Sequence, residues 1–350
     1  MIFSQIIKSC ISSVFLFLYK LNMFLIRQGL KKTLSSPVFV LSVGNLSFGG
    51  SGKTPMVEFL TKELSNKNFF PAIISRGYGR KSYRNTVVSD GRRLLTGVRF
   101  AGDEPYMLAK SLPTVPVIVG NKKKAIAYAY NSFNVKTILL DDAFQTHYIK
   151  KNLELLLIDV SLNLQSYQLF PSGILREPIE AINRADVVVF TKNNFASSSK
   201  EKIKTLVFNA MNKPGVLFLD ADYIITLKNY CHKNNTLLPF TKTIKEPFVA
   251  FCGIANPLIF NLEAKKLGQT NVNSLNFSDH HNYTQKDIFL IKNKLKSIKG
   301  ATILTTKKDL FKISHHFTGC QILILDVKHS INKESQLLEY ITQKINQFSS

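Results

Sequence analysis

The chain has 350 residues, enough to bury one large hydrophobic core or two moderate ones, and its 45% hydrophobic and 20% charged residues are typical of a globular protein. This composition excludes collagen-like, coiled-coil and low-complexity proteins. The net charge of +23 favours a polyanionic partner, such as nucleic acid, an anionic membrane or a phosphorylated substrate, but a general bias toward lysine gives the same excess.

The first predicted element is an apolar helix over residues 11–26. Lys20 and Asn22 interrupt the apolar run, which therefore falls short of the ~20 apolar residues that a membrane-spanning helix needs. No cleavage site of a signal peptide follows it. Because basic residues flank the run, we expect residues 1–28 to lie in the surface of an anionic membrane. The alternative is a helix buried on its own domain.

A glycine-rich loop then joins an apolar strand at residues 38–43 to a helix at residues 57–64. The backbone N–H groups of such a loop converge on a phosphate at the start of the helix. Lys53 is expected to reach the β- and γ-phosphates, and the Thr54 hydroxyl to ligate Mg²⁺. An ordinary glycine turn is the alternative. The predicted nucleotide-binding residues are Ser47, Phe48, Gly49, Gly50, Ser51, Gly52, Lys53 and Thr54.

Short apolar segments and helices alternate after this loop. The predicted helices cover residues 122–130 and 177–182, and the predicted strands are 70–75, 116–120, 137–140, 153–158 and 186–191. This alternation predicts an α/β fold like that of P-loop NTPases, with a parallel sheet and helices on both faces.

A second set of apolar segments follows a polar, Ser/Lys-rich stretch near residues 195–204. Its predicted strands are 215–219, 223–227, 247–254, 301–305 and 321–325. We therefore divide the remaining chain into a P-loop domain over 29–210 and a smaller C-terminal α/β domain over 211–350, with the join between residues 195 and 245.

Two carboxylates, Asp141 and Asp142, follow the predicted strand 137–140. The carboxyl ends of parallel strands meet at one edge of a sheet, so these side chains are expected to face the same crevice as the glycine loop. They are candidates for holding Mg²⁺, directly or through water. Alternatively, they are turn carboxylates that cap a helix.

Three other charged motifs are weak when taken singly. Gly102-Asp-Glu-Pro105 offers a carboxylate that can accept a proton, but the same pattern begins many helices. Arg76 and Arg80 stand on a glycine-rich turn that suits phosphate or sugar recognition, or is simply a solvated loop. The adjacent histidines after Asp279 do not have the spacing of a metal site.

In combination and in this order, the motifs resemble those of the tetraacyldisaccharide 4′-kinases, the lipid A 4′-kinases of Gram-negative bacteria. The matching segments span roughly residues 37–310, nearly the whole chain. They are 43–55, 75–80, 102–105, 141–145, 175–178, 251–257, 279–283 and 306–309.

The resemblance implies an ATP- and Mg²⁺-dependent kinase that phosphorylates the 4′-hydroxyl of a tetraacyldisaccharide 1-phosphate and so forms lipid IVA. It implies that Asp103 is the general base, that His280 raises its basicity, and that Lys53 acts on the phosphates. Thr54, Asp141 and Asp142 are implied as the metal residues. The residues implied on the substrate side are Arg76, Tyr78, Glu104, Gln145, Arg176 and Glu177.

The resemblance also implies a location on the cytoplasmic face of the inner membrane, where the lipid substrate lies. No nucleic-acid-binding motif is present, and no protein partner is implied. The alternatives are another P-loop kinase with a different phosphorylated or lipid substrate, and a membrane-binding protein that uses NTP as a switch. The Asn-Lys-x-Asp element that recognises guanine is absent.

Several positions depart from the family pattern. Thr146 stands where a histidine usually follows the glutamine, with His147 one place later, and Ala143 replaces the commoner glycine. Lys122 and Lys123 occupy the region of an Asp-Arg pair, and lysine cannot make the planar two-pronged contact of arginine. None of these changes removes the glycine loop, the acidic strand end or the Asp103/His280 pair.

Overall fold

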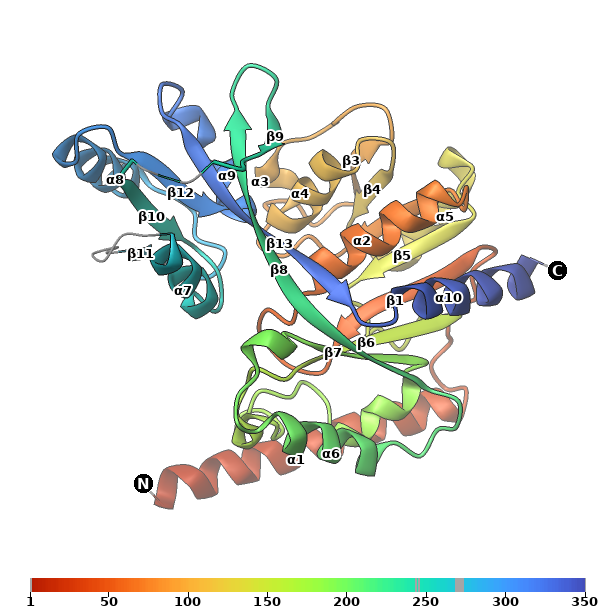
Figure 1. Ribbon diagram of the computed structural model, residues 1–350. Coiled ribbons are helices and arrows are strands. Elements are labelled where there is room, and N and C mark those ends of the chain that lie inside the picture. The colour runs from red at the N-terminus through yellow and green to blue at the C-terminus, as the bar shows by residue number, and fades with distance from the viewer. Residues whose placement is uncertain (1, 243, 245, 268–273, 350) are drawn as a thin grey trace.

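A twisted 13-stranded sheet organises the residues that the computed structural model describes, which are 2–242, 244, 246–267 and 274–349 (Figure 1). In spatial order its strands are β11 (Leu275–Asn276), β10 (Phe248–Cys252), β12 (Thr302–Thr306), β13 (Ile322–Ile331), β8 (Leu217–Cys231), β7 (Val187–Thr191), β6 (Leu153–Asp159), β1 (Phe39–Asn45), β5 (Thr137–Asp141), β2 (Pro71–Ser75), β4 (Pro116–Val119) and β3 (Thr86–Asp90), and β9 (Thr236–Pro239) pairs with β8.

The helices lie on both faces of this sheet (Figure 1). They are α1 (Ile2–Arg27), α2 (Lys53–Asn66), α3 (Val98–Ala101), α4 (Asp103–Ser111), α5 (Lys122–Phe133), α6 (Lys200–Ala210), α7 (Leu258–Lys266), α8 (Gln285–Ser297), α9 (Lys307–Ile313) and α10 (Glu334–Ser349). Short 3₁₀ helices are η1 (Leu164–Ser166), η2 (Ile179–Arg184), η3 (Asn193–Phe195) and η4 (Ser314–His316). The helix predicted at 177–182 is thus the 3₁₀ helix η2, which begins only after Pro178, a residue whose ring fixes the chain in an extended entry.

The central strands β7, β6, β1, β5, β2 and β4 are mutually parallel. All residues of β1, β5 and β6 are buried, because helices α2, α4 and α10 cover one face and α5, α6 and η2 cover the other. The predicted α/β class with a largely parallel sheet is therefore confirmed. The carboxyl ends of β1, β5 and β2 come together at one edge, which places Asn45, Asp141 and Ser75 side by side.

The strands predicted separately at 215–219 and 223–227 are parts of one 15-residue strand, β8, which begins at Leu217. The intervening Asp-Ala-Asp segment suggests a turn, but β8 is only half-buried, so its carboxylates reach solvent without a break in the strand. The strand pairs in parallel with β7 at its start and antiparallel with the ten-residue β13 further on. The β8–β13 ribbon joins the two halves of the sheet.

Helix α10 returns to the first half of the chain after β13. Its buried residues Leu337, Ile341 and Ile345 belong to the same core as Phe39 of β1 and Leu60 of α2. The predicted domain boundary at residue 211 therefore places α10 in the C-terminal domain, although the helix packs in the core of the P-loop domain.

Helix α1 contacts the body through one side and exposes the other. Tyr19 accepts a hydrogen bond of 3.0 Å from Arg184, and the Ser12 hydroxyl donates to the carbonyl of Leu169. Among the described residues, the segment from Ile7 to Arg27 has a mean hydropathy of 1.7 and is long and apolar enough to cross a membrane on length and composition alone. The interruption by Lys20 and Asn22, from which we expected a run too short to span a membrane, therefore does not bring the helix below that limit.

Candidate active site

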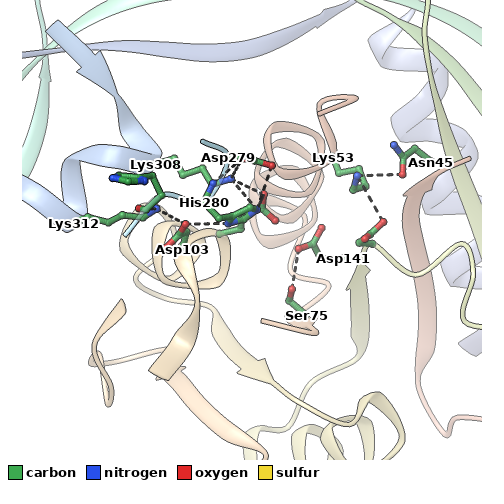
Figure 2. Close-up of polar contacts among 12 residues, drawn as sticks. Asn45, Lys53, Ser75, Asp103, Asp141, Asp279, His280, Lys308 and Lys312 are labelled. Carbon is green, nitrogen blue, oxygen red and sulfur yellow. Dashed lines mark hydrogen bonds and ion pairs between the residues drawn. The ribbon is translucent and has the colours of Figure 1, made fainter. Parts of the chain in front are cut away.

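The glycine loop connects the end of β1 to the first residue of α2, as the sequence predicts. Gly52, at the N-terminus of α2, has φ of +89° and no side chain caps the helix, so its first N–H groups are available to an anion. The ammonium group of Lys53 donates to Asn45 Oδ1 at 3.2 Å and lies 3.7 Å from Asp142 Oδ1 (Figure 2). The loop therefore presents a cation and open amides at the sheet edge.

The first half of the loop is held by backbone bonds to residues 174–176. Phe48 N–H donates to the Ile174 carbonyl at 2.8 Å, and Arg176 N–H donates to the Leu46 carbonyl at 2.7 Å. Ser47 bridges Leu175 in extended conformation, which any residue adopts, so this position does not need glycine. Phe48 is 51% exposed, and the Arg176 guanidinium lies 5.7 Å from its ring.

His329, on β13, contacts the backbone of the glycine loop. It was not among the predicted site residues. Its Nε2 donates to the Gly52 carbonyl at 2.9 Å, although the two residues are 277 positions apart. A Cβ atom on Gly52 would lie 2.7 Å from the His329 ring and 2.6 Å from the Tyr223 hydroxyl. Burial lowers the pKa of His329 to about 4, so the ring is neutral near pH 7. No local pattern in the sequence signals this contact.

Asp141 lies buried at the end of β5 with one oxygen unpaired. Its Oδ2 accepts a 3.0 Å bond from the Ser75 hydroxyl, whereas Oδ1 has no hydrogen-bond partner (Figure 2). Burial, followed by the nearby charges of Glu104 and Asp142, raises the pKa of Asp141 to about 7. A buried carboxylate oxygen without a donor suits a bound cation, so this residue fits a Mg²⁺ site.

Asp142 is instead engaged by arginine. The Arg176 guanidinium donates to both of its oxygens, at 2.9 and 3.1 Å. Burial alone raises the pKa of Asp142, but the charges of Lys53 and Arg176 outweigh it and hold the pKa below its usual range. Among the described residues, no group of three or more His, Cys, Asp or Glu side chains could hold a metal ion. Asp141 therefore fits a metal role better than Asp142 does.

Lys122, one of the departures from the family pattern, is buried beneath these aspartates. Its ammonium group donates to the backbone carbonyls of Asp141 and Asp142, at 3.0 and 2.8 Å, and lies 3.5 Å from the hydroxyl of Thr146. Burial lowers the pKa of Lys122 to about 8. Two atypical residues, Lys122 and Thr146, thus contact each other and fix the end of β5.

Asp103 and His280 meet although 177 residues separate them. Asp103 begins α4, and its Oδ2 lies 3.0 Å from His280 Nδ1 and 2.6 Å from the Lys312 ammonium group (Figure 2). Burial raises the pKa of Asp103, but the bonds from His280 and Lys312 outweigh it, so the net pKa is lowered. The expectation that His280 raises the basicity of Asp103 is therefore wrong, because the bond from His280 stabilises the ionised carboxylate. Oδ1 is left for another partner.

The expected substrate-side residues fall into separate places. Tyr78, 70% exposed, lies with its ring 4.9 Å from that of His280, and Glu104 is 4.0 Å from His280 Nε2, so both adjoin the Asp103/His280 pair. Arg76 is exposed on the turn after β2. Gln145 joins the nucleotide-loop group by donating to the Asn45 carbonyl at 2.9 Å.

Glu177 does not join either group. It is buried, with its two oxygens bonded to His147 and Arg184, and the latter residue also contacts Tyr19 of α1. Its carboxylate therefore supports the attachment of α1. His147, one place beyond its usual position in the family pattern, completes this cluster.

A cavity of about 830 Å³ separates α1 from the segment 167–184. Its lining combines apolar side chains with three basic residues and one acidic residue, and includes Leu16, Met23, Phe24, Leu169, Ile179, Lys20, Arg27, Arg184 and Glu180. Such a lining suits an amphipathic anionic ligand.

Comparisons with known proteins cover nearly the whole chain. The family model described as tetraacyldisaccharide-1-P 4′-kinase, LpxK, matches residues 5–346. A tetraacyldisaccharide 4′-kinase of Desulfotalea psychrophila is 38% identical over 88% of each chain, and one of Desulfatibacillum aliphaticivorans is 31% identical over 96% of this chain and 91% of its own. The crystal structure of LpxK from Aquifex aeolicus in complex with ATP matches with a TM-score of 0.77 and 29% identity, covering 99% of this chain and 100% of that chain.

Proposed function

The chain belongs to the tetraacyldisaccharide-1-phosphate 4′-kinase family, and from this premise we propose how its residues divide the work of phosphoryl transfer. The enzyme uses ATP to phosphorylate a disaccharide lipid in lipid A biosynthesis. The assignment of residues to roles rests on one observation: two clusters of polar side chains lie near the carboxyl edge of the sheet. One surrounds Lys53 and Asp141, and the other surrounds Asp103 and His280 (Figure 2).

In the proposed step, the 4′-oxygen of the sugar attacks the γ-phosphorus of ATP, and the bond from that phosphorus to the β,γ-bridging oxygen breaks. The electron pair of the broken bond leaves with ADP. The hydroxyl proton passes to Asp103 Oδ1, since His280 and Lys312 already bond to Oδ2. Lys53 and the first N–H groups of α2 bind the phosphates and stabilise their developing charge.

Mg²⁺, when bound, neutralises charge on the β- and γ-phosphate oxygens. We assign its protein contacts to the Thr54 hydroxyl and to Asp141, whose Oδ1 lacks a hydrogen-bond donor. Asp142, which is bonded to Arg176 and close to Lys53, is assigned to positioning these two cations.

Asp141→Asn is expected to weaken metal binding by roughly 10–100-fold, the usual cost of removing a carboxylate that orients a metal site. Electron paramagnetic resonance of Mn²⁺, added with ATP to the purified protein, measures this loss independently of turnover. Exposed Asp222→Asn is the matched control and should bind Mn²⁺ as the wild type does. Unchanged Mn²⁺ affinity in Asp141→Asn would remove this residue from the metal site.

We place α1 on the cytoplasmic face of the inner membrane, where the lipid substrate lies. Two features support this location: the apolar residues exposed along α1, which include Val14, Phe17 and Leu21, and the basic residues near its end. The adjoining 830 Å³ cavity is suited to part of the acylated substrate, because its apolar wall lies beside Arg27 and Arg184.

Replacing Phe17 and Leu21 together by Asp is expected to reduce activity toward lipid in anionic vesicles more than toward lipid dispersed in detergent. Two apolar side chains that would enter the membrane surface are lost and two repelled charges are introduced. Vesicle co-sedimentation and activity in both formats measure the effect. Phe289→Asp is the control, because Phe289 and Phe17 are both 65% exposed. Equal losses in both formats would assign α1 to the protein core.

We retain three functional regions: residues 1–28 at the membrane, a P-loop domain over 29–210, and a C-terminal region from 211. The packing of α10 on β1 and α2 supports adding residues 334–349 to the P-loop domain.

A further inference from the structure

Helix α9 supplies two lysines, one helical turn apart, to the Asp103/His280 pair (Figure 2). Lys312 bonds to Asp103, whereas Lys308 Nζ lies 3.0 Å from His280 Nε2. An ammonium group can only donate, so Nε2 of His280 must accept this bond. The neutral ring therefore carries its proton on Nδ1, which donates to Asp103 Oδ2.

Without Lys308, nothing would offset the carboxylates that face Nε2, so this nitrogen would also bind a proton while Nδ1 stays bonded to Asp103. Two carboxylates face this nitrogen, with Asp279 Oδ2 at 3.9 Å and Glu104 Oε1 at 4.0 Å. Each would accept a proton bound to Nε2 after a small movement. Lys308 lies 3.1 Å from Asp279 and 3.6 Å from Glu104, so it offsets both charges while it occupies the Nε2 lone pair.

The backbone holds His280 in this position. Its φ of +55° lies in the left-handed region, which is strained for a residue with a side chain. The His280 N–H donates to Asp279 Oδ1, the same oxygen that Lys308 contacts. The His280 ring also contacts the ring of Tyr78, with 4.9 Å between the ring centroids. Lys308 thus makes two contacts, one with Asp279 in the loop that carries His280 and one with Nε2, the ring nitrogen that faces away from Asp103.

We propose that Lys308 is a positioning residue that fixes the Nδ1-protonated tautomer of His280 and thereby aligns Asp103 to receive the hydroxyl proton. The inference rests on the proposed roles of Asp103 and His280. In this proposal, Lys308 acts on the reaction only through His280 and contacts neither the lipid nor ATP.

The test compares Lys308→Met, Lys308→Arg and the exposed control Lys296→Met, each as the full chain. The ¹⁵N shifts of the His280 ring, assigned by their loss in His280→Ala, report which ring nitrogens are protonated. We expect the Nδ1-protonated form in the wild type and in Lys296→Met, and a shift toward a ring protonated at Nε2 as well in Lys308→Met. Lys308→Arg retains a donor and should restore much of the wild-type signal.

Kinetics should follow the same order. Lys308→Met is expected to lower kcat by on the order of tenfold or more, with KM for ATP and lipid within about twofold of the wild type. In a His280→Ala background, Lys308→Met should have no further effect. An unchanged protonation of the ring, an unchanged kcat, a further loss in that background, or a selective rise in KM would each overturn the inference. Full activity of His280→Ala would instead reject the proposed role of the histidine itself.

Discussion

Lys53→Ala is expected to lower kcat for phosphoryl transfer by on the order of 10²-fold or more. Lys53 begins α2, and its ammonium group faces Asn45 and Asp142 at the sheet edge, where the phosphates are proposed to bind. A preorganised cation at this point stabilises the charge that develops as the γ-phosphoryl group moves, and alanine supplies no replacement. Steady-state kinetics with saturating ATP and lipid measure the loss.

Lys62→Ala is the matched control, because Lys62 is exposed on the same helix and its removal should leave kcat unchanged. Circular dichroism should show the same fold in both variants. If Lys53→Ala turned over at the wild-type rate, the assigned nucleotide site would be wrong.

Asp103→Ala and His280→Ala are each expected to reduce kcat strongly, with a smaller effect on the apparent affinity for ATP. General base catalysis typically contributes 10²–10⁴-fold, roughly the range to be lost here. The double variant should be little worse than the worse single variant, because the 3.0 Å contact between Nδ1 and Oδ2 makes the two residues one unit. A double-mutant cycle on kcat measures this coupling.

Asp103→Asn supplies a further control, since it keeps the size of the side chain but not its charge, and should be as inactive as Asp103→Ala. Multiplicative losses in the double variant would indicate independent roles. An unaffected kcat in Asp103→Ala would point to another base. Glu104 would then be the stronger candidate, because both oxygens of Asp142 are bonded to Arg176.

The central sheet and the glycine loop could be predicted because their signals are local. Buried parallel strands are short apolar runs, and the loop lies where one such run meets a helix. Asp141 follows the same logic, since a carboxylate after a buried strand must lie at the carboxyl edge of the sheet. Its free oxygen depends on the placement of Ser75, from another strand, and therefore could not be predicted.

Long-range contacts account for most of what the sequence did not reveal. His329 reaches Gly52 only because β13 runs back along β8, and Lys308 reaches His280 only because α9 packs beside the loop that carries it. Neither contact leaves a periodic or spaced pattern in the sequence. The resemblance to a known family paired Asp103 with His280, but it did not identify the lysines that hold them.

The neighbouring residues Arg176 and Glu177 illustrate a further limit. The chain bends at Arg176 and Glu177, and their adjacent side chains leave it in different directions. Arg176 accordingly faces Asp142 at the site, whereas Glu177 turns toward His147 and Arg184 beneath α1. The family motif implies that both residues contact the substrate, but in the fold their side chains lie in two different places.

The most direct test of the account is a transfer assay with the purified full-length protein, [γ-³²P]ATP, Mg²⁺ and tetraacyldisaccharide 1-phosphate in mixed micelles. The account predicts a radiolabelled lipid whose new phosphate is located at the 4′-oxygen by NMR of the unlabelled product. Label at another hydroxyl, or release of labelled inorganic phosphate without lipid labelling, would contradict it.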